Sequence, residues 1–215
     1  YIALGGLVRS TTKEILRVLG QVHSVVPQDV KIHLFGIARY RALREFTELG
    51  VSSIDSASVL RKAWLGAELN FLTLEGWYSA IRVPPSKGFR AKRLIKEDVI
   101  KEDQLHKLEK DCLYGLRKYA GSHESPKKSL VDLLVHYDEL IAGTRKKTRE
   151  RIQKTLEERP WEKCGCSICK HWGIEVAIFR GNNRNRRRGF HNTYVFYQLI
   201  DQIMAGKRIP WLHDD

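Results

Sequence analysis

The sequence predicts an α/β fold, because short apolar strands alternate with amphipathic helices along its first 60 residues. Two other observations add to this prediction. Three of the four cysteines crowd into one six-residue segment, and the chain carries a formal net charge of +13. Together they indicate an α/β protein with a metal-binding segment and a polyanionic partner, with nucleic acid ahead of a membrane surface.

The first section, residues 1–60, is predicted to contain three strands separated by two helices. The strands are predicted over residues 1–4, 31–37 and 52–56. The first helix begins after the capping sequence at Ser10 and Thr11 and ends at Pro27, and the second ends at Gly50. Strands and helices joined by short connections are typical of a parallel α/β sheet or barrel.

The second section, residues 61–160, has a less regular pattern. It is predicted to hold an extended insertion, a loop and two helical stretches, over residues 69–83, 84–88, 97–120 and 128–158. A basic run at residues 145–149 lies inside the last stretch. A solvated helix face explains this run more simply than a dedicated binding site does.

The third section, residues 161–215, holds the cysteine segment. It is further predicted to contain a strand, an Arg/Asn-rich loop and a closing helix, over residues 174–179, 180–190 and 191–206. No stretch of the chain approaches the roughly 18 uncharged apolar residues that a membrane span needs. The sequence also lacks a secretory signal, so the expected location is the cytoplasm, with no membrane partner.

The clustered cysteines are too close together to staple a fold: Cys164, Cys166 and Cys169. Clustered thiols in a reducing compartment favour metal binding. Zinc prefers four thiolate or imidazole ligands in a tetrahedron, and His191, 22 positions after the last of these cysteines, can complete the set. The alternatives are that the thiols are free, or that His171 or Cys112 is the fourth ligand. A full set of four predicts one structural zinc per chain.

The predicted Arg/Asn-rich loop is a candidate nucleic-acid interface. It holds five arginines and no acidic residue: Arg180, Arg184, Arg186, Arg187 and Arg188. Arginine makes bidentate phosphate contacts and asparagine can contact base edges, although a generic basic surface loop is the simpler alternative. Residues 1–60 hold seven basic and five acidic residues, so +11 of the net charge lies beyond them.

Asp55 stands at the end of the third predicted strand. Catalytic groups of (β/α)8 barrels lie at the carboxyl ends of strands, and a carboxylate can attack the anomeric carbon of a sugar. From the pattern alone, an aspartate at this position is more often a helix cap. The Gly5 and Gly6 pair after the first strand is by default a tight turn, but it can also expose backbone groups to a ligand.

Four segments resemble the tRNA-guanine transglycosylase family in their order and spacing. They are residues 3–7, residues 33–37, residues 50–56 and the Cys-x-Cys-x-x-Cys…His set. The resemblance covers residues 1–60 and 160–206 well and the middle poorly. The arginine-rich stretch, the insertion and Ser58–Arg61 in place of the family's Thr-Arg favour the DNA-modifying branch over the tRNA branch.

The resemblance implies a role for each matched residue. Asp55 would attack the anomeric carbon and expel guanine, and an incoming 7-deazaguanine base such as preQ0 would then displace Asp55. The residues implied to bind the base are Gly5, Gly6, Leu7, Phe35 and Gly36. The implied partner is DNA, with tRNA as the alternative, and the implied cofactor is structural zinc.

The resemblance also implies the C-terminal part of a TIM (β/α)8 barrel with an appended zinc-binding subdomain. Only the last three barrel strands are expected here, and no position matches the family's second catalytic aspartate. Because the barrel would be incomplete and the chain starts at Tyr1, we expect part of a larger enzyme, acting as a homodimer or with a complementing N-terminal chain. A non-catalytic, zinc-containing nucleic-acid-binding protein is the remaining alternative.

Overall fold

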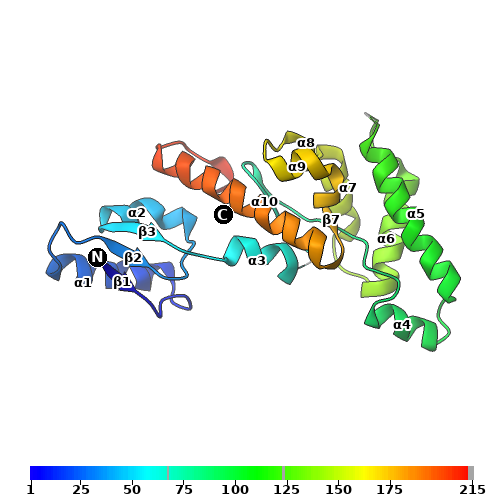
Figure 1. Cartoon of the computed structure of the whole chain (residues 1–215), viewed down its shortest axis with the longest axis horizontal. Coiled ribbons are helices and arrows are strands. Elements are labelled where there is room, and N and C mark those ends of the chain that lie inside the picture. Colours follow the sequence, from blue (N-terminus) through cyan, green and yellow to red (C-terminus); the bar gives the residue numbers. More distant parts are fainter. Residues whose placement is uncertain (67, 123, 213–215) are drawn as a thin grey trace.

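The computed structural model describes residues 1–66, 68–122 and 124–212, so the last three residues of the predicted third section lie outside the described residues. The chain is elongated, with a small sheet at one end and long helices at the other (Figure 1). The elements confirm the predicted α/β class, although helices dominate. No helix in the described ranges combines the length and apolar character needed to cross a membrane.

The first section forms a three-stranded parallel sheet in the order β1-β2-β3. Its elements are β1 (Ile2–Leu4), α1 (Thr12–Val25), β2 (Ile32–Leu34), a 3-10 turn (Tyr40–Ala42), α2 (Leu43–Glu48) and β3 (Val51–Ile54). Helix α1 starts at the predicted cap, where Thr11 and Glu14 form a reciprocal capping box. The predicted order is confirmed. Within the described ranges these strands form no closed barrel, so the barrel stays a prediction.

The predicted insertion is extended, as expected. After α3 (Ser58–Leu65), the chain forms an antiparallel hairpin of β4 (Phe71–Thr73) and β5 (Gly76–Tyr78). Strand β6 (Ile81–Arg82) then pairs in parallel with β7 (Ile178–Phe179). The strand predicted over residues 174–179 is therefore wrong for its first half, since Gly173–Val176 is a 3-10 turn.

The helices of the middle section differ from their predicted bounds. They are α4 (Phe89–Lys96), α5 (Glu102–Ala120), α6 (Lys128–Ala142), α7 (Thr148–Glu158) and α8 (Pro160–Lys163). The predicted helix over 97–120 starts later, and α4 was missed. The predicted helix over 128–158 is two helices, because Gly143 leaves α6 with a left-handed φ of 78°.

The basic run at residues 145–149 falls at this break rather than on one solvated helix face, which corrects that interpretation. Arg145 forms an ion pair with Asp138, which is buried. Arg149 forms another with Asp132, at 2.6 Å. The run thus joins α6 to α7.

The Arg/Asn-rich loop predicted after α9 (Ser167–Trp172) is wrong, because all of it except Arg180 is helical and begins α10 (Gly181–Met204). Arginine is a good helix former, and the helix is held by its packing on α3. At the crossing, a Cβ on Gly189 would lie 2.9 Å from Trp64 Cζ3 and 3.1 Å from Leu60 O. Glycine at position 189 thus permits a close helix contact.

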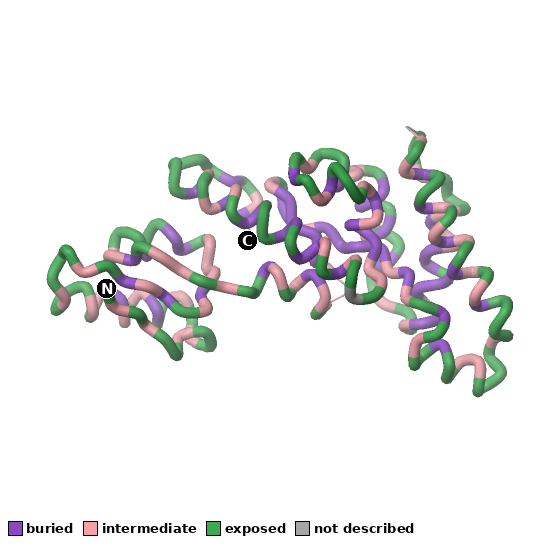
Figure 2. Tube along the Cα trace, in the orientation of Figure 1, coloured by how far each residue is buried: buried purple, intermediate pink, exposed green. Residues whose placement is uncertain are grey.

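Two apolar clusters form the core of the described part of the chain. One is built by the helices and short strands of the middle section and the cysteine segment. The other joins the β1-β2-β3 sheet and its helices to the second half of α10 and the last turn, Pro210–Leu212. Buried residues line the inner strands and the packed side of α10 (Figure 2). The boundaries at residues 60 and 160 stay a prediction.

Candidate active site and metal centre

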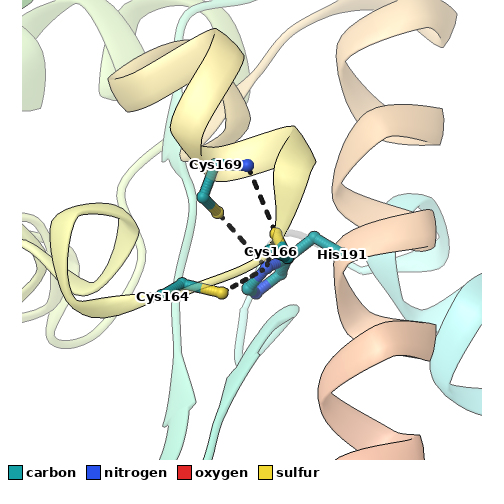
Figure 3. Close-up of side chains that lie close together, drawn as sticks. All are labelled: Cys164, Cys166, Cys169 and His191. Atoms are coloured by element: carbon teal, nitrogen blue, oxygen red, sulfur yellow. Dashed lines mark hydrogen bonds between the residues drawn. The ribbon is translucent and has the colours of Figure 1, made fainter.

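The cysteine segment and α10 bring four potential metal ligands together (Figure 3). Cys164 follows α8, Cys166 caps α9, Cys169 lies within α9, and His191 projects from α10. The Sγ atoms of the three cysteines lie 3.5, 3.5 and 3.3 Å from His191 Nδ1. Tetrahedral zinc with ordinary Zn–S and Zn–N bonds separates sulfur from nitrogen by about 3.5 Å. The arrangement can therefore hold a metal ion.

His191 is held in the orientation that a ligand needs. Its side chain is fully buried, and its Nε2 lies 2.8 Å from the Leu72 carbonyl oxygen. When Nε2 donates to this carbonyl, Nδ1 keeps its lone pair and faces the sulfurs. Of the alternative ligands, Cys112 is buried in α5 outside the group, and the exposed His171 packs against Trp172.

The pKa values of the group are shifted in opposite directions, because its thiols and its imidazole hydrogen bond to one another. Burial lowers the pKa of His191, but its hydrogen bonds with Cys164 and Cys166 outweigh burial and raise the pKa to about 9. The pKa of Cys166 is lowered, because the side chains of Cys164 and Cys169 hydrogen bond to it. Hydrogen bonds with Cys164 and Cys166 instead raise the pKa of Cys169. Because a metal ion binds thiolates and neutral imidazole, its binding would release the protons that these groups hold.

A second group of predicted residues lies at the carboxyl edge of the parallel sheet. Leu4, Leu34 and Ile54 are level with one another in the register, so Gly5, Phe35 and Asp55 leave the sheet at one edge. The sheet thus brings together the residues assigned from three separate segments.

The Asp55 carboxylate has two polar neighbours at this edge. Its Oδ1 accepts a hydrogen bond from the Gly36 N–H at 2.7 Å and lies 3.5 Å from His33 Nε2. Its side chain remains 61% exposed. Gly36 has a left-handed φ of 72°, and a Cβ there would lie 2.8 Å from Val8 Cγ2. Glycine at this position therefore aims the backbone N–H at Asp55.

Aromatic and glycine residues surround this carboxylate. Phe35 is 51% exposed, and its ring meets the His33 ring edge-on, with centroids 4.7 Å apart. Gly6 turns with a φ of 78°, and Leu7 beside it is partly buried. His33, whose Nδ1 lies 2.8 Å from Ser53 Oγ, was not assigned from the sequence. Its position two residues before Phe35 in the strand predicted over residues 31–37 was the available signal.

The five arginines of the predicted interface have three different environments. Arg180 forms an ion pair with Glu109, and Arg184 forms another with Glu175 at 2.5 Å. Arg186 is exposed, while Arg187 lies 3.2 Å above the Trp172 ring.

Arg188 is fully buried, so its predicted contact with nucleic acid is contradicted by its lack of exposed surface. Its guanidinium donates to the carbonyl oxygens of Ala63, Val176 and Ile178, at 2.7, 3.0 and 3.1 Å. Burial lowers its pKa to about 9. Arg188 thereby joins α10 to α3 and β7.

Helix α10 also connects the two sites. His191 lies against the three cysteines of the group. The next residue, Asn192, donates a hydrogen bond from its Nδ2 to the carbonyl oxygen of Val59 in α3, at 3.1 Å. Helix α3 begins three residues after Asp55. The metal centre and the strand edge are thus built on one helix pair.

Fold and sites together define an α/β protein that combines a Cys3His group able to hold a metal ion with a carboxylate at a strand edge, as the guanine transglycosylase resemblance implies. No protein-family model matches the sequence. A curated protein from Salmonella montevideo, "DNA-guanine transglycosylase", is 40% identical over 208 residues, which cover 95% of this chain and 50% of that protein. This homology confirms the resemblance to the tRNA-guanine transglycosylase family, DNA branch. The chain spans about half the length of that relative.

Proposed function

We propose that this chain takes part in base exchange in DNA, replacing guanine with a 7-deazaguanine precursor such as preQ0. The observation that carries the proposal is the 40% identity to a DNA-guanine transglycosylase over 95% of the chain. The Asp55 edge and the Cys3His centre support it, because they match the residues that the family resemblance assigns.

Asp55 is the nucleophile in this proposal. The Gly36 N–H holds Oδ1, whereas Oδ2 accepts no hydrogen bond from the described residues. Oδ2 attacks C1′ of the target nucleotide, and a C1′–O bond forms as the C1′–N9 bond breaks. The bonding pair leaves with guanine, which takes up a proton. N9 of the incoming base then attacks C1′ and loses its proton to solvent as the carboxylate departs.

We assign the residues around Asp55 to binding of the target base. An extruded guanine must leave the helical stack, and the half-exposed Phe35 ring offers a surface on which it can stack. The turn at Gly5 and Gly6 and the neighbouring Leu7 offer backbone groups to the base edge. Gly36 has no side chain and so allows the base to approach closely, although its N–H already donates a hydrogen bond to Asp55.

Zinc fits the four-residue metal centre, because three thiolates and one imidazole leave no open coordination position. The bound ion would link α9 to α10 and so have a structural role. Of the arginines in the first half of α10, we assign phosphate contacts to Arg186 and Arg187, which are not engaged in ion pairs among the described residues. The expected location stays the cytoplasm.

The test is exchange of labelled guanine in duplex DNA by the full chain. Asp55→Asn removes the attacking charge, so exchange should fall on the order of 10³-fold or more. Asp29→Asn, a matched change at an exposed turn, should leave exchange unchanged.

Exchange at the wild-type rate in Asp55→Asn would show that another residue is the nucleophile. Exchange in tRNA but not in DNA would favour the tRNA alternative. Binding of nucleic acid by the wild-type chain without any exchange would favour the non-catalytic alternative.

A further inference from the structure

His33 lies beside the Asp55 carboxylate and is not among the residues that the family resemblance assigns. Its side chain, on β2, is only 19% exposed, and its Nε2 lies 3.5 Å from Asp55 Oδ1. The Gly36 N–H donates to the same oxygen at 2.7 Å. Both polar neighbours therefore lie on Oδ1, which leaves Oδ2, the oxygen assigned to the attack, without a hydrogen bond from the described residues.

The second nitrogen of the His33 ring determines what the first presents to Asp55. His33 Nδ1 lies 2.8 Å from Ser53 Oγ, and the two residues face each other in the register of β2 and β3. A serine hydroxyl can donate to Nδ1, and a neutral imidazole that accepts at Nδ1 carries its proton on Nε2. The Tyr1 hydroxyl also lies within hydrogen-bond distance of Ser53 Oγ, so it can donate to that oxygen while Ser53 donates to His33.

The other tautomer of His33 is disfavoured by the same neighbours. With its proton on Nδ1, the ring would turn the lone pair of Nε2 toward a carboxylate oxygen, and two acceptors would face each other without a proton between them. An N–H on Nε2, directed at Asp55 Oδ1, is the arrangement that satisfies both Ser53 and Asp55.

We infer that His33 is a positioning residue for base exchange, whose Nε2–H donates to Asp55 Oδ1. Together with the Gly36 N–H, it holds the carboxylate so that Oδ2 is directed at the sugar. The inference rests on the proposed function, because it takes Asp55 to be the nucleophile. Since the Asp55 side chain is largely exposed, packing alone does not fix its orientation, and a nucleophile held in the attacking geometry reacts faster.

The His33 ring has a second neighbour, which offers a purely structural alternative. It meets the Phe35 ring edge-on, so His33 could instead support the surface assigned to the base. The two roles use different parts of the side chain: the N–H faces Asp55, and the edge contact faces Phe35. Substitutions that keep one part and remove the other therefore separate them.

The experiment measures kcat and KM of the full chain for exchange of labelled guanine in duplex DNA. His33→Phe keeps a ring beside Phe35 but removes the N–H, so kcat should fall about 100-fold while KM stays within about twofold. His33→Gln keeps an N–H near the position of Nε2 but removes the ring, so kcat should stay within roughly fivefold of wild type. His136→Phe, a matched change at an exposed position of α6, should alter neither constant.

A second measurement uses the wild-type chain and depends on neither activity nor the folding of a variant. Nitrogen NMR at about pH 8, where an ordinary histidine is neutral, shows which ring nitrogen carries the proton. The His33 signals are assigned by their absence from His33→Gln. A proton on Nε2 supports the inference, and a proton on Nδ1 overturns it.

A large loss of kcat in His33→Phe, with kcat retained in His33→Gln, supports the positioning role. A kcat that stays high in His33→Phe, or that falls as far in His33→Gln, overturns it, while exchange by the wild-type chain leaves the proposed function standing. No exchange by the wild-type chain overturns the proposed function and the positioning role with it.

Discussion

The strand edge at Asp55 and the Cys3His centre differ in how deeply their side chains are buried and in how they are held. Three of the four potential metal ligands are buried and the fourth is partly buried, and the imidazole lies within hydrogen-bond distance of a backbone carbonyl. Asp55 is 61% exposed and has one hydrogen bond from the backbone. Removing a residue from the centre should therefore affect stability, whereas changing Asp55 should affect activity and leave stability within about 0.5 kcal/mol.

The largest effect is expected from Cys166→Ala. Loss of a ligand from a buried metal site leaves the other ligands without their common partner. We expect the free energy of unfolding to fall by more than about 4 kcal/mol and Tm by about 10 °C. Elemental analysis should show zinc falling from one per chain to well below one.

Cys112→Ala is the matched control, because Cys112 is a fully buried thiol outside the centre. This substitution should lower the free energy of unfolding by roughly 1 kcal/mol and leave the zinc content unchanged. If both variants lose the same stability and neither loses metal, the centre is an ordinary apolar core and the comparison fails.

A smaller effect is expected from Arg188→Met. The substitution leaves the carbonyl groups of Ala63, Val176 and Ile178 without their donor in a buried place, so it should destabilise the fold by about 3 kcal/mol. Arg186→Met, at an exposed position of the same helix, should change stability by less than about 0.5 kcal/mol. Urea unfolding measures both. An equal decrease in the free energy of unfolding of both variants would mean that burial does not distinguish these arginines.

Local signals predicted the end of the third strand and the clustering of the four potential metal ligands. The helix that precedes β2 begins at its predicted capping box, and Asp55 directly follows its strand as expected. The cysteine spacing is short enough that a single turn and helix α9 arrange three ligands. In these places neighbouring residues determine the geometry, so the sequence is sufficient.

The first half of α10 could not be predicted in the same way. Its glycines and asparagines favour a loop by composition, whereas contacts made across the fold keep it helical. Arg188 bonds to Ala63, which is 125 positions away, and Gly189 fits against Leu60. The ion pair between Arg184 and Glu175 adds to these contacts. Such partners are brought together only by the fold, and for that reason a basic stretch of one composition divides into buried, paired and exposed arginines.

The most direct test of the proposed function is the mass of the protein after incubation with a guanine-containing DNA oligonucleotide, quenched under denaturing conditions. The proposal predicts a covalent adduct on the peptide that contains Asp55. The mass of the protein should increase by the mass of the oligonucleotide minus one guanine base. The adduct should disappear when 7-deazaguanine base is added and should be absent from Asp55→Asn. An adduct on a different residue, or one that persists in Asp55→Asn, would contradict the role of Asp55 as nucleophile.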